Sequence, residues 1–182
     1  SGASAHLVIG KSGDIVQLAL FNIKTWHAGK SSWKGRNSLN HYSIGIELDN
    51  AGILENREDG YYTAFNRKID PASVVLACHK LDTSVEAWEA FPKEQIEAVT
   101  EVCRVLKDSY HIRKILGHDD ISPTRKRDPG PAFRKSVRNR LSGEGNQAPP
   151  GFEARGRISP PGEEVEKIQH ETTTWNGEPA IR

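Results

Sequence analysis

The segment 92–111, "PKEQIEAVTEVCRVLKDSYH", constrains the fold of this chain most, because its apolar residues recur at helical spacing. They follow one another at steps of three and four residues: Ile96, Val99, Cys103, Leu106 and Tyr110. This spacing places them on one face of an α-helix. Pro92 suits the first turn, where no backbone N–H is needed. The sequence therefore predicts a long amphipathic helix.

Two other segments show the period of two that is typical of strands. Residues 5–20, "AHLVIGKSGDIVQLAL", read as a β-hairpin because two β-rich runs flank the turn residues "KSGD". Residues 42–50, "YSIGIELDN", predict a half-buried strand with Glu47 on the face opposite the isoleucines. Strands combined with a long helix indicate an α/β (α+β) fold, a β-sheet with helices packed on it.

The remaining segments carry weaker patterns. Residues 51–70 are rich in Gly, Asn and charge, so we expect a long insertion loop there. Residues 72–80 fit a short strand or a helix equally well. We expect a short strand over 112–118 that ends at His118, and a second, shorter helix over 131–141.

The composition changes after Ser142. The stretch "GEGNQAPPGFEARGRISPPGEE" is dense in Gly and Pro and buries too little apolar surface to fold alone. The sequence thus predicts one folded domain over residues 1–142 and an extended tail or linker over 143–182.

Charge and hydropathy exclude several classes of protein. The 182 residues carry a formal net charge of +1, so no global field favours nucleic acid or an anionic membrane surface. No apolar run approaches the roughly 20 residues that span a bilayer, and no signal peptide is visible. The two cysteines, Cys78 and Cys103, make neither a disulfide scaffold nor a Cys-rich zinc site. Compartment and oligomeric state stay open.

The segment 117–133, "GHDDISPTRKRDPGPAF", concentrates the candidate chemistry. His118 stands ten residues before Asp128, so the loop must fold back to bring them together. Imidazole nitrogen and carboxylate oxygen are normal zinc donors, and a catalytic zinc takes three protein ligands and one water. Pro129 restricts the backbone directly after the aspartate. The alternative is that His118 caps a strand end and Asp128 pairs with an arginine in a solvated loop.

Four further residues are candidates for a site. Apolar neighbours raise the pKa of a carboxyl group, so Glu47 is a candidate general base, or else an ordinary polar-face residue. Lys126 suits the stabilisation of an oxyanion, or else is a solvated surface lysine. Trp26 and His27 put an aromatic ring and an imidazole before a turn, although Trp26 equally suits a core.

Four segments in order carry a resemblance: "SAHLVIGKSGDIVQL", "TWHAG", "NHYSIGIELDN" and "GHDDISPTRKRDPGPAF". From about Ala3 to Phe133 the chain resembles the zinc-dependent N-acetylmuramoyl-L-alanine amidases of the amidase-2 type, relatives of peptidoglycan recognition proteins and phage amidases. The resemblance implies a central mixed β-sheet flanked by helices, with zinc in a groove. It also implies cleavage of the amide between N-acetylmuramic acid and the L-alanine of the stem peptide.

The resemblance assigns roles to four of the candidates. His118 matches the second zinc ligand and Asp128 the third. Glu47 matches the general base, which takes a proton from water and passes it to the leaving amine. Lys126 matches the cation that holds the oxyanion together with zinc.

The resemblance also concerns the substrate. Trp26 and His27 match a segment that lines the substrate groove. The insertion at roughly 52–92 is longer than in the smallest members, and we expect it to form one wall of the groove and to influence stem-peptide preference. The expected partner is peptidoglycan or a muropeptide, either intact murein or an anhydro-muropeptide.

One element of the resemblance has no match. The first zinc ligand of the family is a histidine on a strand upstream of the hairpin, in a segment similar to "VIHYT". Three explanations are open: residues precede this chain in the whole protein, the protein has been cut, or His6, His27 or His41 substitutes. We favour the first, because losing that strand leaves the sheet with an open edge.

Two other functions compete with the enzyme. The first is a recognition module that binds peptidoglycan without cutting it, as relatives do when a zinc ligand is missing. The second is an interaction protein whose His/Asp loop is only a solvated surface. The combination of His118, Asp128, Glu47 and Lys126 favours an enzyme, because a pure binder does not need all four.

Overall fold

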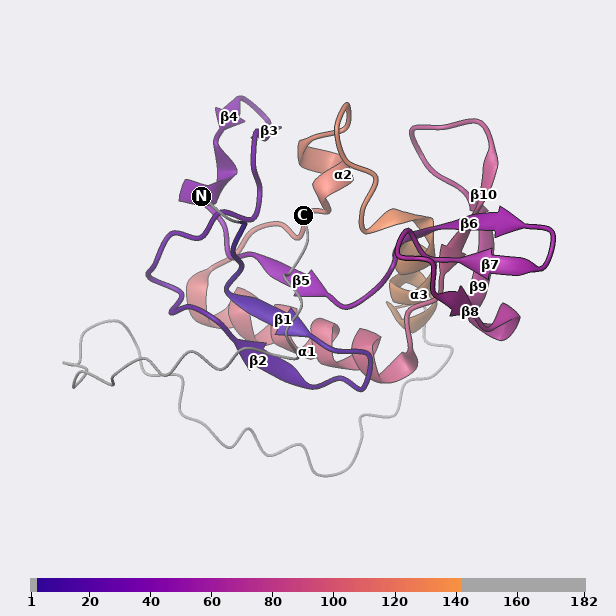
Figure 1. The fold of residues 1–182 in the computed structure, drawn as a ribbon. Helices are drawn as coiled ribbons and strands as arrows, with labels where there is room; N and C mark the ends of the chain where they lie inside the picture. The colour runs from indigo at the N-terminus through magenta and orange to yellow at the C-terminus, as the bar shows by residue number, and fades with distance from the viewer. Residues whose placement is uncertain (1–2, 142–182) are drawn as a thin grey trace. The chain divides into compact units, whose positions relative to one another are not determined.

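The computed structural model describes residues 3–141, with the side chains of residues 3–137. A mixed three-stranded sheet is formed by strands that lie between residues 7 and 48. Strand β1 (Leu7–Ile9) lies in the centre, antiparallel to β2 (Ile15–Gln17) and parallel to β5 (Ile46–Leu48) (Figure 1). The expected hairpin and the expected strand around Glu47 are both confirmed, and so is the mixed α/β character of the fold.

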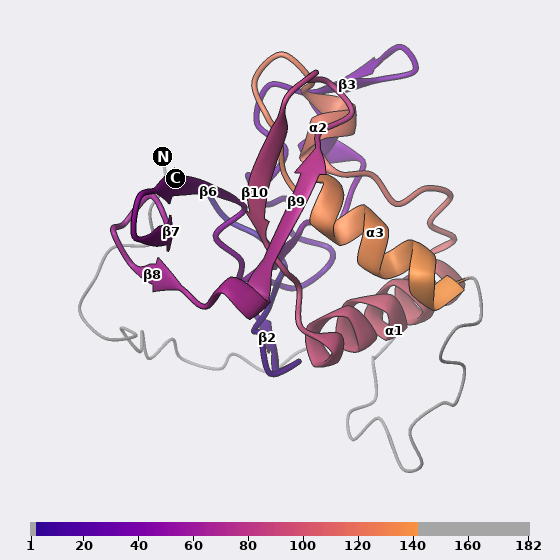
Figure 2. The same ribbon diagram turned by 90° about the vertical axis from the view of Figure 1, so that its right-hand side faces the viewer.

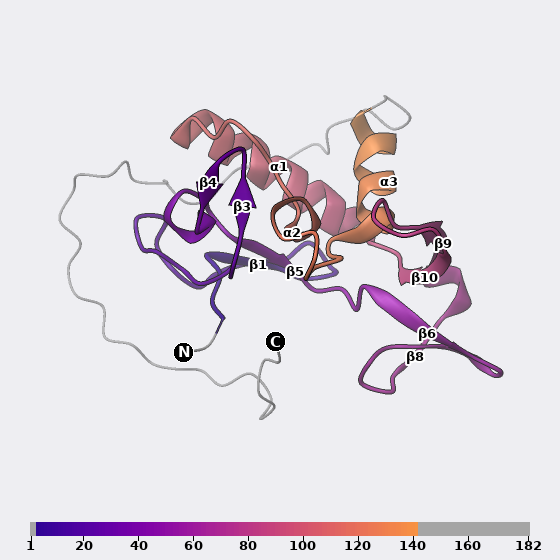
Figure 3. The same cartoon turned by 90° about the horizontal axis from the view of Figure 1, so that it is seen from above.

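Helix α1 (Lys93–Tyr110) runs alongside this sheet (Figures 1 and 3). Ile96, Val99 and Leu106 of its apolar stripe are buried, which confirms the helix that the spacing predicted. Gln95 is also fully buried, and its side-chain amide donates hydrogen bonds to the main-chain oxygens of Ile9 at 3.0 Å and Asp49 at 3.1 Å. The helix is thereby bonded to the backbone just where β1 and β5 end.

A second sheet has the strand order β8-β7-β6-β10-β9 and was not expected. Its strands are β6 (Ile53–Arg57), β7 (Gly60–Tyr62), β8 (Lys68–Ile69), β9 (Val74–Cys78) and β10 (Val85–Glu89). The expectation of a loop over 51–70 was wrong, and the ambiguous segment 72–80 is a strand. The polar strands are joined by backbone hydrogen bonds, so they need only a small core, which consists of Leu54, Ile69 and Ala87.

The expected strand over 112–118 was also wrong. Residues 112–117 have no regular structure, and His118 is the first residue of the short helix α2 (His118–Ile121). The Gly117 N–H donates to the Asp120 carboxylate at 2.8 Å, which satisfies a backbone donor before the first turn. This short-range bond, together with the lack of a partner strand for 112–117 among the described residues, accounts for the difference.

The second expected helix is confirmed as α3 (Gly130–Leu141). It lies between the β9–β10 hairpin and α1 (Figure 2), where the rings of Phe133 and Phe91 meet edge to face at 5.3 Å.

The remaining short elements are β3 (Ser32–Trp33), β4 (Arg36–Asn37), η1 (Leu39–His41) and η2 (Pro71–Ser73). No helix within residues 3–141 combines the length and apolar character that crossing a bilayer requires. The predicted tail, 143–182, lies outside the described residues.

Candidate functional site

Glu47 occupies the middle of β5 and is directed away from the half-buried side chains of Ile46 and Leu48. Its carboxylate is accessible to solvent, yet protein surrounds it on most sides. This burial raises the pKa of Glu47, and the charge of Asp128 adds to the effect, whereas His118 and Lys126 oppose it. The same interactions locate Glu47 beside the loop that carries these three residues.

His118 and Asp128 contact each other directly. The Nδ1 atom of the His118 ring hydrogen-bonds to the Oδ2 atom of Asp128, so the ten-residue loop does fold back. This bond raises the pKa of His118 against the opposing effect of burial. Burial, the largest single effect, would raise the pKa of Asp128, but the bond and the charge of His118 together with the charge of Lys126 and a backbone hydrogen bond outweigh it, so the pKa is lowered. Each group of the pair therefore shifts the pKa of the other in the direction that favours their ion pair.

The backbone around Gly117 explains how the loop closes. A Cβ atom at position 117 would lie 2.4 Å from Cδ of Pro129 and 2.5 Å from Oδ1 of Asp119, so only glycine leaves room for both. The Asp119 N–H donates to the main-chain oxygen of Asp128 at 2.8 Å. Both ends of the loop are thus held together by backbone as well as by the side chains of His118 and Asp128.

Lys126 lies on the same loop, two residues before Asp128. Its Nζ atom is 3.7 Å from Oδ1 of Asp128, and one third of its side chain is exposed. The Lys126 N–H donates to the main-chain oxygen of Ser122 at 2.9 Å, which anchors the loop to the end of α2. The ammonium group is therefore held near the carboxylate and still reaches solvent.

His27 is committed to hydrogen bonds within the protein. Ser43 donates its hydroxyl hydrogen to the Leu39 oxygen at 2.7 Å, so its Oγ accepts from Nε2–H of His27 at 2.8 Å. Nδ1 of His27 is then the acceptor for the Thr25 hydroxyl, also at 2.8 Å. Burial, with contributions from His6 and His118, lowers the pKa of His27 to about 4. A neutral His27 ring thus has no nitrogen left for a metal.

His6 is buried, and both of its ring nitrogens are also bonded. Nε2 lies 2.8 Å from the Ile23 oxygen, to which it donates, and Nδ1 accepts from the Gly45 N–H at 2.9 Å. His6 and His27 therefore do not supply the missing zinc ligand, because neither ring leaves a lone pair free. Instead, His6 bonds to Gly45 and His27 bonds to Ser43, two residues of the segment that precedes β5.

Trp26 is mostly exposed, with 53% of its surface accessible, and the Nζ atom of Lys24 lies 4.2 Å from its ring centroid. The residues that follow it pack next to the His118 loop, since Ala28 and Ile121 share a core cluster and the Ser122 hydroxyl donates to the Lys30 oxygen at 2.9 Å. Trp26 itself lies two residues before Ala28 in this segment. Its role in binding a substrate stays a prediction.

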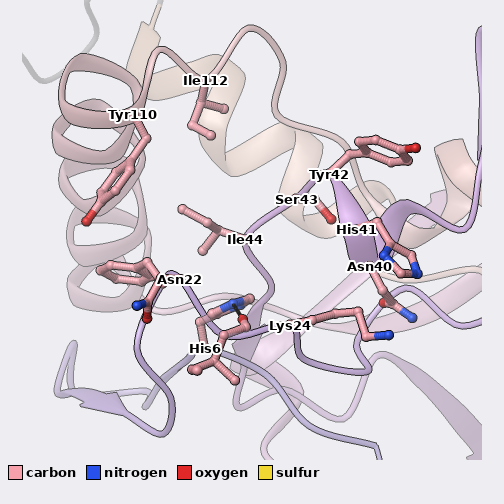
Figure 4. A pocket seen from close by; sticks show the side chains of 12 residues that line it. His6, Asn22, Lys24, Asn40, His41, Tyr42, Ser43, Ile44, Tyr110 and Ile112 are labelled. Carbon is pink, nitrogen blue, oxygen red and sulfur yellow. Dashed lines mark hydrogen bonds between the residues drawn. The ribbon is translucent and has the colours of Figure 1, made fainter. Parts of the chain in front are cut away.

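A pocket of about 320 Å³ opens elsewhere, between the segment before β5 and the end of α1. Figure 4 shows His6, His41, Tyr42 and Tyr110 around it. None of Glu47, His118, Lys126, Asp128, Trp26 or His27 is among its lining residues. The pocket is therefore separate from the place where the candidate catalytic groups meet.

Sequence analysis missed a buried polar pair next to the site. His79, at the end of β9, is 1% exposed, and its Nε2 atom lies 3.2 Å from Oδ2 of the equally buried Asp119. Asp119 follows His118 directly, so its position in the motif was a signal of importance. Nothing in the linear sequence pointed to its partner 40 residues earlier.

The donor chemistry of the site suits the zinc ion that the resemblance implies. A histidine nitrogen and a carboxylate oxygen lie in contact at His118 and Asp128, and half of the Asp128 side chain is exposed. Among the described side chains, no group of three or more His, Cys, Asp and Glu residues is arranged to hold a metal. The described residues therefore fit as two of the ligands of such an ion.

Comparisons with known proteins find relatives of this chain. The 1,6-anhydro-N-acetylmuramyl-L-alanine amidase AmpD of Escherichia coli is 33% identical over 132 residues, which are 71% of this chain and 53% of AmpD. The N-acetylmuramoyl-L-alanine amidase AmiD of E. coli is 34% identical over 110 residues, 59% of this chain and 30% of AmiD.

A solved complex of E. coli AmiD with anhydro-N-acetylmuramic acid-L-Ala-D-γ-Glu-L-Lys superimposes with a TM-score of 0.55 at 28% identity. The match covers 75% of this chain and 47% of AmiD. This chain thus spans about half the length, or less, of the relatives described here. The family model for N-acetylmuramoyl-L-alanine amidases of the amidase-2 type matches residues 1–131, and the chain belongs to this family.

Proposed function

We propose that this chain carries the catalytic site of a zinc-dependent amidase that cleaves the bond between N-acetylmuramic acid and L-alanine in peptidoglycan or muropeptides. One observation carries the proposal: Glu47 from β5 lies beside His118 of α2 and the loop that bears Lys126 and Asp128. A base, a cation and two metal donors are thereby assembled from three separate parts of the chain. Family membership supports the same reaction class.

His118 and Asp128 would hold the metal, with further ligands from outside the described residues. When bound, zinc lowers the pKa of its water to about 7 and polarises the scissile carbonyl. The remaining steps fall to the protein side chains.

Glu47 suits the role of general base because burial raises its pKa above that of a solvated carboxyl group, which makes it a better proton acceptor. It accepts a proton from the attacking water and delivers it to the leaving nitrogen of L-alanine. Its position on a strand held by β1 limits its movement during this transfer.

Lys126 suits the stabilisation of the negative charge that develops on the carbonyl oxygen. Its ammonium group is held 3.7 Å from the Asp128 carboxylate and one third of the side chain is exposed, so it can reach a bound substrate. Trp26 offers an exposed ring, two residues before Ala28, for contact with the sugar or the peptide. The substrate in the AmiD complex, an anhydro-muropeptide, is the first one to test.

The test is cleavage by the full-length gene product, supplied with zinc, of an anhydro-muropeptide and of purified murein. Release of the stem peptide is followed by liquid chromatography and mass spectrometry. Glu47→Gln keeps the size of the side chain but removes the base, so we expect kcat to fall about 10²–10⁴-fold. The matched control is Glu55→Gln on β6, because Glu55 is exposed and pairs with Arg57 on the same strand. The control should retain full activity.

The outcomes separate the competing functions. Cleavage that depends on Glu47 supports the amidase. Muropeptide binding without cleavage, in a protein that retains zinc, identifies a recognition module and overturns the proposal. If the protein neither binds nor cleaves muropeptides, the remaining interpretation is an interaction protein.

A further inference from the structure

The hairpin formed by β9 and β10 holds the loop that carries His118 and Asp128. It reaches this loop, residues 117–130, through side chains spread along its turn and its second strand. The four contacts are His79 with Asp119, Lys80 with Asp120, Asp82 with Arg127, and Trp88 with Gly130. The hairpin belongs to the insertion, which supplies none of the candidate catalytic groups.

The contact between His79 and Asp119 has a defined direction. The Leu81 N–H donates to Nδ1 of His79 at 3.1 Å, so Nδ1 is an acceptor and the ring hydrogen sits on Nε2. Nε2 then donates to Oδ2 of Asp119 at 3.2 Å. His79 is thus oriented by its own hairpin before it bonds to the loop.

Asp119 connects His79 to both candidate metal ligands, His118 and Asp128. It is the residue after His118, and its N–H donates to the main-chain oxygen of Asp128 at 2.8 Å. Its buried carboxylate is balanced by Arg134, 2.8 Å from Oδ1, and by Lys80, 3.2 Å from Oδ2. A buried carboxylate with all its partners in place is costly to move, so Asp119 acts as a fixed point for the loop.

Trp88 holds the other end of the same loop. Its indole N–H donates to the Ala77 oxygen at 3.1 Å, and its ring stacks on His79 at 5.8 Å between centroids. A Cβ atom on Gly130 would lie 2.6 Å from this ring, so the backbone two residues after Asp128 is pressed directly against Trp88. The two ends of the loop therefore rest on neighbouring, stacked side chains.

We infer that His79 is a positioning residue, which holds His118 and Asp128 at their mutual distance through Asp119. The inference rests on the proposed function only in treating these two residues as metal ligands. Partners of metal ligands in the outer sphere typically change metal affinity about 10–100-fold when they are lost. The insertion would then serve the metal site as a support, whether or not it also contacts substrate.

The test compares two amide side chains at position 79 in the full-length protein. In His79→Gln the amide nitrogen reaches the place of Nε2 and can still donate to Asp119. In His79→Asn it is one methylene shorter, ends at the place of Nδ1 and cannot reach Asp119. Two quantities are measured: zinc affinity by competition with a chelator, and hydrogen exchange of the Asp119 amide in the metal-free protein.

We expect His79→Asn to lower zinc affinity about 10–100-fold and to lose protection of the Asp119 amide. His79→Gln should stay within a few-fold of the unaltered protein in both measurements. The control Leu54→Ala removes a core side chain of the same sheet that contributes no bond to the loop. It should lower the stability of this sheet and leave zinc affinity unchanged.

The inference is overturned if Asn and Gln at position 79 behave alike, or if Leu54→Ala weakens zinc as much as His79→Asn does. In both cases the hairpin would contribute stability only. Because neither readout depends on turnover, a failure of the proposed amidase activity would leave this comparison intact. If His79→Asn does not fold, a His79→Gln variant with greatly weakened zinc affinity would equally overturn the inference.

Discussion

The two sheets contribute to the site in different ways. The three-stranded sheet presents Glu47 directly, on a short strand paired with β1 and backed by α1. The five-stranded sheet presents no candidate catalytic group, yet its hairpin contacts the loop that carries His118 and Asp128 through His79 and Trp88. Reactive groups and their supports thus come from separate layers of the fold.

The two sheets also differ in the contacts that stabilise them. The first sheet is bonded to α1 through the fully buried Gln95 and includes the fully buried Ile9. The second sheet has a core cluster of Leu54, Ile69 and Ala87 and a buried Trp88, and its strands β9 and β10 pair along their length. We expect the second sheet to open more easily than the sheet that carries Glu47, and this contrast can be tested.

The largest expected effect comes from Leu54→Ala in the core of the second sheet. Removing a buried leucine side chain costs about 2–5 kcal/mol of unfolding free energy. We expect the strands β6, β7 and β10 to lose protection in hydrogen-exchange mass spectrometry, while β1 and α1 keep theirs. Equal loss of protection in both sheets would show that they unfold as one cooperative unit.

A smaller effect is expected where the two sheets meet. Glu89 on β10 is 4% exposed, forms an ion pair with Lys11 from the β1–β2 turn and accepts the Ala51 N–H at 2.6 Å. Glu89→Gln keeps an acceptor for Ala51 but removes the charge, and should cost about 1–3 kcal/mol in urea unfolding. The exposed control Glu55→Gln should cost less than about 1 kcal/mol. Similar unfolding free energies for the two variants would show that the charge of Glu89 adds no stability where the two sheets meet.

The smallest effect distinguishes the two cysteines, one in each region. Burial raises the pKa of the Cys103 thiol on α1, so less of the reactive thiolate is present at a given pH, and Cys78 on β9 is exposed. Iodoacetamide should therefore label Cys78 first. The rate at Cys103 should still be rising at pH values where an ordinary thiol is fully ionised. Faster labelling of Cys103 at neutral pH, measured by peptide mapping, would contradict the packing of α1.

Part of this arrangement follows from local sequence patterns. The period of the apolar residues in 92–111 suffices for α1, and alternation suffices for the hairpin and for the direction of Glu47 on β5. These patterns predict structure correctly because the residues that share one buried face of a helix or strand are near one another in the chain. The motif around His118 and Asp128 also indicated that the loop must fold back.

The second sheet and the start of α2 did not follow from such patterns. Strands β7 and β8 have three and two residues, too short and polar for alternation to be recognised. Strand β10 pairs with β6, about 30 residues earlier, and such a pairing leaves no local signal. At His118, the bond from Gly117 to Asp120 favours a helical turn over the strand expected from the apolar residues before it.

Residue types and their spacing determine which groups this chain has for chemistry: a carboxylate on a strand, a histidine and an aspartate on one loop, and a lysine between them. Only the tertiary structure decides that Glu47 faces that loop and that His79 supports it. The reason is physical: periodicity records which face of one segment avoids water, whereas a bond such as that from His79 to Asp119 forms between segments that meet only after folding.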